Sequence, residues 1–234
     1  MTETTRCGVS QSGGMEVSMA VKAVIFDMDG VLFDTEKLCM DSWVAVAGEA
    51  GIPDMEAFFP SCIGRNLTDT KELFRDFYGD TYDFEQFRRQ ASAWFHDYVE
   101  KKGLPVKKGV KEILEFLQGA GYLIGLASST SRPSVEDHLQ RAEIRQYFQS
   151  LTTGDMVEHS KPQPDIYLMA CESLGVNPGE AMAIEDSPNG IRAAHSAGMI
   201  SVMVPDLIAP DQEMRDKSAL ICEDLLEVMR FLDK

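Results

Sequence analysis

Short apolar runs that alternate with helical segments are the feature that most constrains how this chain can fold. The runs predicted as buried strands cover residues 20–26, 122–127, 150–153, 181–184 and 200–204, with an edge strand at 219–222. The predicted helices among them cover residues 109–119, 133–141, 164–174, 188–197 and 224–232. Strands that alternate with helices form a parallel sheet covered on both faces. We therefore expect an α/β fold with a doubly wound, Rossmann-like parallel sheet.

A purely helical stretch interrupts this alternation directly after the first strand. Apolar residues at helical spacing predict helices at 36–50, 54–60, 67–79 and 83–102. We expect three parts, namely a flexible N-terminal extension at 1–19, an α/β core made of 20–34 and 106–234, and an all-helical cap at 35–105. Ligands bind at the carboxyl ends of parallel strands, so the cap should lie over the binding site.

Charge and composition exclude several classes of partner. The 234 residues include 22 Lys and Arg against 38 Asp and Glu, a net charge of −16. Nucleic acids and anionic membranes attract basic patches, so we expect neither as a partner. The five cysteines show no C-x-x-C spacing, which argues against a disulfide framework or a structural zinc site. With neither a bilayer-spanning apolar run nor a signal-peptide pattern, we expect a cytoplasmic protein, and by default a monomer.

Two carboxylates follow the first strand directly, in the sequence D-M-D-G at Asp27 to Gly30. A carboxylate there could be a metal ligand, a nucleophile or a surface charge. An EF-hand is excluded because the sixth position of that loop must be glycine and is Leu32 here. The buried strand before the pair and three further loops favour a functional role.

Two of those loops can hold an anion. Ser128, Ser129 and Thr130 follow a strand and precede a helix, so their hydroxyls and backbone N–H groups make an anion seat. Lys161 lies between turn-forming residues and is followed by Pro162, which restricts the local backbone. An ammonium placed in this way can neutralise a phosphate and lower the pKa of a nearby carboxylate.

The last loop carries an acidic pair, Glu185 and Asp186, again at the end of a predicted strand. Carboxylate oxygens suit Mg²⁺, which typically takes one or two carboxylates together with substrate phosphate. Because the carboxyl ends of parallel strands meet at one edge, we expect all four loops to converge there.

Together the four loops resemble the haloacid dehalogenase-like hydrolase superfamily, in the subfamily with a helical cap after the first motif. The matching segments are D-M-D-G-V-L-F-D-T-E, A-S-S-T, S-K-P-Q-P-D and A-I-E-D-S-P-N-G-I-R-A-A, within a resemblance that covers about residues 20–234. The resemblance implies an Mg²⁺-dependent enzyme that passes through an aspartyl-phosphate.

The resemblance also assigns roles to individual residues. Asp27 would be the nucleophile, and Asp29 the general acid and base. Ser128 would hold the transferring phosphoryl group, and Lys161 would pair with that group and with Asp27. The metal site implied by the family comprises Asp27, the backbone carbonyl of Asp29, Asp186, and Glu185 as a ligand or as a neighbour of the ligands. Further residues expected to face the substrate are Thr35, Glu36, Cys39, Gly64, Arg65, Asn66, Ser129 and Thr130.

The similar families include both phosphatases of small metabolites and β-phosphoglucomutase-like proteins. Those mutases carry a histidine where this chain has Cys39, and an arginine a few residues beyond the loop glycine, where Arg65 follows Gly64 directly and Leu67 lies further on. These departures favour hydrolysis of a small phosphorylated metabolite, such as a sugar phosphate, with the phosphomutase as the alternative. A non-catalytic phospho-acceptor module is a third hypothesis. Of the histidines, only His159 is expected near the site.

Overall fold

The computed structural model describes residues 21–234, so the extension predicted at 1–19 lies outside the described residues. The strands are β1 (Ala23–Phe26), β2 (Leu123–Ser128), β3 (Ser150–Thr153), β4 (Ala181–Glu185), β5 (Ile200–Met203) and β6 (Leu220–Ile221). The helices are α2 (Thr35–Ala50), α3 (Met55–Phe58), α4 (Leu67–Tyr78), α5 (Phe84–Lys102), α6 (Val110–Gly119), α7 (Arg132–Arg141), α8 (Asp165–Leu174), α9 (Pro188–Ser196), α10 (Gln212–Lys217) and α11 (Leu225–Leu232). Short 3₁₀ turns cover Phe59–Cys62, Arg145–Tyr147 and Pro178–Glu180.

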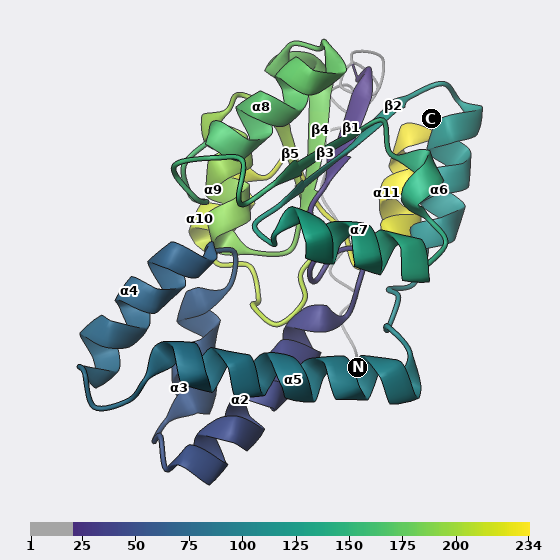
Figure 1. Cartoon of the computed structure of the whole chain (residues 1–234). Helices are drawn as coiled ribbons and strands as arrows, with labels where there is room; N and C mark the ends of the chain where they lie inside the picture. Colours follow the sequence, from purple (N-terminus) through teal and green to yellow (C-terminus); the bar gives the residue numbers. More distant parts are fainter. Residues whose placement is uncertain (1–20) are drawn as a thin grey trace, which may run out of the picture.

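The six strands form one parallel sheet in the order β3-β2-β1-β4-β5-β6. β1 lies between β2 and β4, with Phe26 opposite Leu126 on one side and Ile184 on the other. Helices lie on both sides of the sheet (Figure 1), which confirms the predicted doubly wound α/β fold. The strand order reverses at β1, and such a switch point is where parallel sheets bind ligands.

The two faces of the sheet bury different residues because side chains alternate along each strand. Val24 and Phe26 belong to the larger cluster, with α6 and α11. Ala23 and Ile25 belong to the second, with α8 and α9. Alanines recur in this second cluster on the sheet and on α9, so the helices on that face can approach closely. All four β1 residues are fully buried, which fixes the strand that leads into the first acidic loop.

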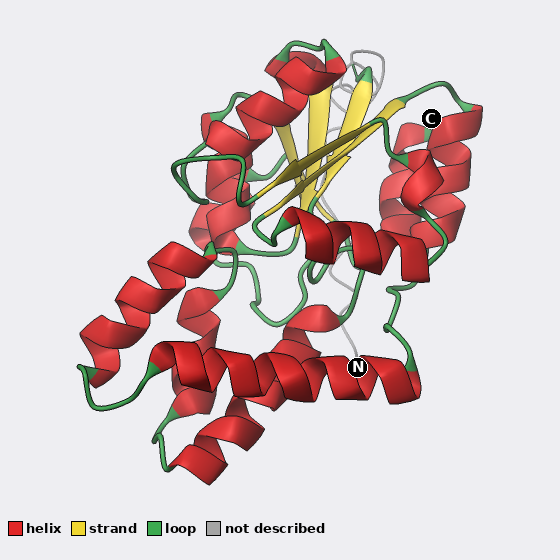
Figure 2. Cartoon of the chain, in the orientation of Figure 1, coloured by secondary structure: helices red, strands yellow, loops and turns green. Residues whose placement is uncertain are grey.

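Helices α2 to α5 form a helical insertion, residues 35–102, below the end of the sheet (Figure 2). The segments that enter and leave it run side by side, since Asp34 N–H donates to Pro105 O and Lys107 N–H to Leu32 O. The Lys107 ammonium also pairs with Asp206 in the loop after β5, at 2.7 Å. The insertion is therefore anchored to the core at both of its ends.

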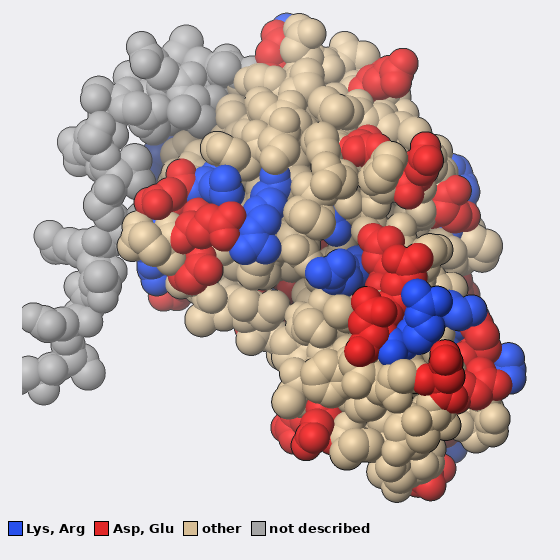
Figure 3. Space-filling model, turned by 90° about the vertical axis from the view of Figure 1, so that its left-hand side faces the viewer, with Lys and Arg blue, Asp and Glu red and all other residues tan. Residues whose placement is uncertain are grey.

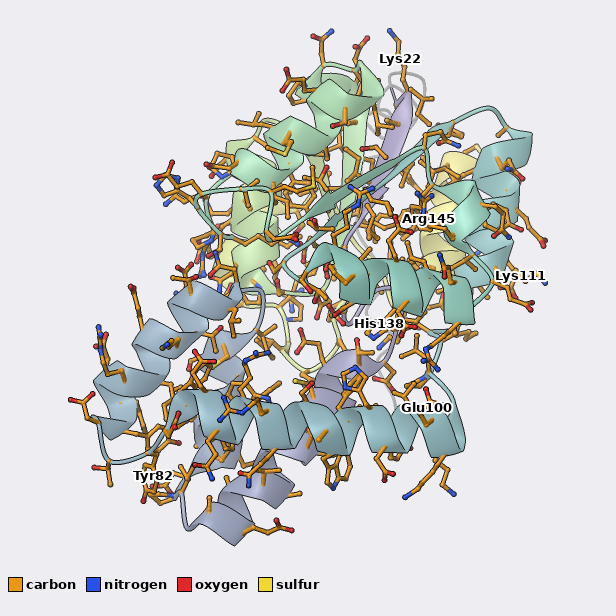
Figure 4. All side chains as sticks on the ribbon, viewed as in Figure 1. Lys22, Tyr82, Glu100, Lys111, His138 and Arg145 are labelled. Atoms are coloured by element: carbon orange, nitrogen blue, oxygen red, sulfur yellow. The ribbon has the colours of Figure 1, made fainter. Side chains whose placement is uncertain are left out.

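Helix α5 of the insertion lies against α7 of the core. The buried His138 ring stacks on Phe95 at 6.0 Å between centroids and packs edge-on to Phe33 at 5.9 Å. Arg141 pairs with Glu100 at 2.8 Å at the same contact, and Figure 4 labels His138 and Glu100 there. This contact orients the insertion relative to the sheet.

Two elements differ from the sequence-based expectation. The helix predicted at 54–60 ends as α3 at Phe58 and continues as a 3₁₀ turn that contains Pro60, because proline lacks the N–H that an α-helix would use. Helix α10 was not predicted. It has only six residues and depends on tertiary contacts, since Met214 is fully buried and Glu213 forms a two-bond pair with Arg192 of α9.

Phe74 of α4 tests how the insertion is stabilised. It is 1% exposed and contacts the rings of Phe58, Tyr78, Phe84 and Phe87, whereas Phe77 on the same helix is 61% exposed. We expect Phe74→Ala to lower the free energy of unfolding by about 3–5 kcal/mol, because it leaves a cavity. The matched Phe77→Ala variant should lose less than about 1 kcal/mol in urea denaturation. Equal losses would contradict this packing.

Candidate active site

The four predicted loops meet at the carboxyl edge of the sheet. Asp27 directly follows β1, Ser128 ends β2, Glu185 ends β4, and Lys161 lies between β3 and α8. The Lys161 ammonium connects them. It donates to Asp27 Oδ1 at 2.5 Å, to Glu185 Oε1 at 2.7 Å and to the Ala127 carbonyl at 3.0 Å. Only 1% of Lys161 is exposed, so these three acceptors replace the water around its charge.

Asp186 adds a third carboxylate to this cluster. One oxygen from each of Asp27, Glu185 and Asp186 lies within 4.8 Å of the others, and all three residues are buried. Ionised together, the three buried carboxylates would exceed the charge of the one ammonium, so protons or a cation must balance them. Burial raises the pKa of Asp27 to about 8, although Lys161 opposes the rise. Burial and then Glu185 raise the pKa of Asp186 well above its usual range.

These groups fit a divalent cation of the Mg²⁺ type. The donors are hard carboxylate oxygens, and the cluster lacks positive charge. The Lys161 ammonium alone cannot balance the charge of three carboxylates, even though the pKa of Lys161 is raised. Burial works against the charge on Lys161, but Asp27 and Glu185 outweigh that effect.

Two glycines make room for the carboxylates. A Cβ on Gly30, whose φ is +85°, would collide with the Asp186 carboxyl group. A Cβ on Gly190 would collide with the carboxyl group of Glu185. Both positions therefore require glycine for steric reasons, and Gly30 also needs it for its positive φ.

Asp29 is held separately from the cluster. Thr35 Oγ1 donates to its Oδ1 at 2.5 Å, and Thr130 Oγ1 donates to its Oδ2 at 2.8 Å. The Thr130 hydroxyl thus links the hydroxyl loop to the first loop, and its backbone N–H donates to Ser128 Oγ at 3.1 Å within the hydroxyl loop. In this structure both hydroxyls orient Asp29, and the predicted contact of Thr35 and Thr130 with substrate stays a prediction.

Glu185 makes contacts that the sequence did not indicate. Its Oε1 accepts from the Tyr167 hydroxyl at 2.6 Å as well as from Lys161, and its Oε2 accepts from Ser187 Oγ at 3.2 Å. Burial and then Glu185 raise the pKa of Tyr167 well above its usual range, so the phenol stays a donor. Tyr167 gave no sequence signal because it lies in the apolar pattern of α8 with Ile166 and Ala170.

The insertion contacts the site loops through two backbone carbonyls and one carboxylate. Ser129 Oγ donates to Gly64 O at 3.1 Å, and Asn189 Nδ2 donates to Ile63 O at 3.1 Å. Ser160, next to Lys161, donates to Asp69 of α4. The 63–69 segment of the insertion therefore lies directly against the loops that carry the charged cluster.

The remaining predicted residues have other partners in this structure. Arg65 donates from Nε to Ser61 O at 3.0 Å, and the Asn66 side chain accepts from Asp69 N–H as the N-cap of α4. Their contact with substrate stays a prediction. His159, expected near the site, is 61% exposed at its side chain and pairs with Asp165.

Glu36 and Cys39 lie on the first turns of α2, where the insertion begins. Burial and then Asp29 raise the pKa of Glu36 well above its usual range. Burial and then Glu36 raise the pKa of the Cys39 thiol. Both side chains are partly buried, and the charge of Asp29 raises the pKa of each, so both lie near the first acidic loop.

In the part of the chain that the structure describes, no second group of three or more His, Cys, Asp or Glu side chains has its ligand atoms as close together as Asp27, Glu185 and Asp186. Among residues 21–234, no helix is both long and apolar enough to cross a bilayer. On the face drawn in Figure 3, Lys and Arg lie among Asp and Glu and do not gather into one basic patch.

Comparison with known proteins agrees with this geometry. A phosphorylated carbohydrates phosphatase of Thermotoga maritima is 34% identical over 184 residues, which cover 76% of this chain and 82% of that protein. CbbY from Rhodobacter sphaeroides, solved in complex with phosphate, superposes with a TM-score of 0.77 at 25% identity and covers 92% of this chain and 100% of its own. A protein of Thermotoga maritima described as a putative β-phosphoglucomutase has a TM-score of 0.72 at 29% identity, with 91% and 99% covered.

The family model described as haloacid dehalogenase-like hydrolase matches residues 24–204, from β1 through the strand that follows the acidic pair. That span contains all four motifs and the whole helical insertion. The resemblance predicted from the motifs is confirmed, and this chain belongs to the haloacid dehalogenase-like hydrolase family.

Proposed function

We propose that this chain is an Mg²⁺-dependent phosphatase that hydrolyses a small phosphorylated metabolite, a sugar phosphate, through an aspartyl-phosphate on Asp27. The observation that carries the proposal is the buried Lys161 ammonium, 2.5 Å from Asp27 and 2.7 Å from Glu185. A carboxylate that attacks a phosphate ester meets electrostatic repulsion, and a buried counter-charge at this position reduces it.

In the first half of the reaction, Asp27 attacks phosphorus. Its Oδ1 is bonded to Lys161, so Oδ2 is the nucleophilic oxygen. The P–O bond to the leaving group breaks as the Asp27–phosphorus bond forms. Asp29, oriented by Thr35 and Thr130, gives its proton to the departing oxygen. Ser128 and the neighbouring backbone would hold the transferring group.

In the second half, the roles of Asp29 reverse. Its carboxylate takes a proton from a water molecule, which attacks the phosphorus of the aspartyl-phosphate. The bond to Asp27 breaks, phosphate leaves, and Asp29 is protonated again for the next cycle. Because Thr35 comes from the insertion and Thr130 from the core, both parts of the chain orient this residue.

Mg²⁺ would be held by Asp27, Asp186 and the Asp29 carbonyl, with Glu185 beside them, and would supply positive charge to the phosphoryl oxygens. We further propose that residues 35–105 act as a cap over a core of 20–34 and 106–234. The similarity to a phosphorylated carbohydrates phosphatase supports a sugar phosphate as substrate. A cytoplasmic monomer is part of the same proposal.

A phosphomutase would use the same cluster and a second phosphate group, and one structural neighbour is described as a putative β-phosphoglucomutase. The residue at position 39 argues against a phosphomutase. Burial raises the pKa of the Cys39 thiol, so this side chain is a poor substitute for a titrating histidine. Leu67, the first residue of α4 and 48% exposed, likewise provides no charge at its position.

Replacement of the nucleophile tests the proposal. With Mg²⁺ and a panel of sugar phosphates, we expect Asp27→Asn to lower phosphate release at least about a thousandfold, because no aspartyl-phosphate can form. Asp34→Asn is the matched control on the same loop. Its side chain is 49% exposed and 3.9 Å from Lys107, so activity should stay within about twofold.

Two results would contradict this proposal. Full activity of Asp27→Asn would exclude the covalent route and favour a non-catalytic role for the cluster. Bisphosphate-dependent interconversion of sugar phosphates with little free phosphate would identify a mutase.

The loss of thermal stability on metal removal should depend on pH. Asp27 titrates near 4 when unfolded and at about 8 in the folded, metal-free chain. Between these values folding takes up a proton, so metal-free stability should fall as pH rises toward 8. Cation binding releases that proton and strengthens over the same range. We expect the increase in Tm caused by saturating Mg²⁺ over EDTA to grow from about pH 6 to about pH 8, and to be flatter in Asp27→Asn. A pH-independent increase would contradict this account.

A further inference from the structure

Tyr167 lies in the first turn of α8, directly behind the charged cluster. It is fully buried, and its backbone N–H donates to Pro164 O at 3.0 Å. Its hydroxyl donates to Glu185 Oε1 at 2.6 Å. The Lys161 ammonium lies over its ring, 5.1 Å from the centroid. One side chain therefore contacts both the catalytic lysine and a carboxylate of the cluster.

The hydrogen bonds around Lys161 leave little freedom for its position. An ammonium has three donors, and Lys161 uses them on Asp27, Glu185 and the Ala127 carbonyl. If Glu185 moved, it would draw the ammonium away from Asp27. The exact placement of Glu185 thus determines the placement of the charge that faces the nucleophile.

Tyr167 is one of the groups that fix Glu185. Oε1 of Glu185 accepts from Tyr167 and Lys161, while Oε2 accepts from Ser187. Without the phenol, Oε1 would keep only the lysine as a donor. A buried carboxylate that loses one donor compensates by pairing more closely with the other. The tyrosine ring also offers its electron-rich face to the lysine.

We propose that Tyr167 is a positioning residue, which fixes Glu185 and the Lys161 ammonium so that the ammonium stays directed at Asp27. Its effect on turnover rests on the proposed phosphatase function. Because the ring is fully buried behind the cluster, Tyr167 acts through these two residues and touches no substrate.

Turnover separates this role from simple packing. We expect Tyr167→Phe to lower kcat about tenfold, the effect of losing one hydrogen bond to a charged group, while KM for a sugar phosphate changes less than about twofold. Tyr147→Phe is the matched control, since Tyr147 is 9% exposed and packs in the larger core cluster. It should leave kcat unchanged. Wild-type kcat in Tyr167→Phe would overturn the positioning role.

A double-mutant cycle tests the contact without turnover. In the wild-type background, Tyr167→Phe should lower the folding equilibrium constant about tenfold, as measured by urea denaturation in the presence of EDTA. In the Glu185→Gln background, Tyr167→Phe should lower the same equilibrium constant less than about threefold, because the acceptor at position 185 is no longer charged. Equal effects in both backgrounds would refute the coupling.

The two proposals can fail separately. If the wild-type chain hydrolyses no phosphorylated metabolite, the proposed function fails, and the cycle alone decides for or against Tyr167. If the wild-type chain is active and Tyr167→Phe is equally active, the function stands and the positioning role is wrong.

Discussion

A single buried ammonium is the constraint on which the rest of the structure depends. Lys161 is 1% exposed and bonded to Asp27, Glu185 and a backbone carbonyl. A charge removed from water in this way is stable only with partners of opposite charge in good geometry. The carboxylates nevertheless outnumber it, because Asp186 belongs to the same cluster. That imbalance favours the binding of a cation.

The fold brings this cluster together from distant parts of the sequence. β1 occupies the centre of the sheet, so Asp27 is flanked by the end of β2 on one side and of β4 on the other. The helical insertion leaves the sheet directly after the first acidic loop and returns beside it through the pairing of residues 34 and 105. Its 63–69 segment lies against the loops of the core. The contact between the insertion and these loops and the assembly of the charged cluster are thus consequences of one topology.

Much of this could be predicted from the sequence, and the parts that could not have physical reasons. The alternation of strands and helices identified the parallel sheet, and four loops at strand ends identified Asp27, Lys161 and the acidic pair. The family resemblance implied the contact between Lys161 and Asp27, but the other pairwise contacts across the fold were beyond such patterns. Thr35 and Thr130 orient Asp29, and Tyr167 supports Glu185 from a helix position whose spacing indicated only core packing. Helix α10 was not predicted because its six residues depend on tertiary contacts for their stability.

The most direct test of the account is a crystal structure of the chain grown with Mg²⁺ and beryllium trifluoride, a mimic of the phosphoryl group. The account predicts beryllium bonded to a carboxylate oxygen of Asp27, with the Lys161 ammonium beside its fluorines and a cation bound by Asp27 and Asp186. Beryllium trifluoride bound to another residue would contradict the account. So would a cluster that binds no cation at saturating Mg²⁺.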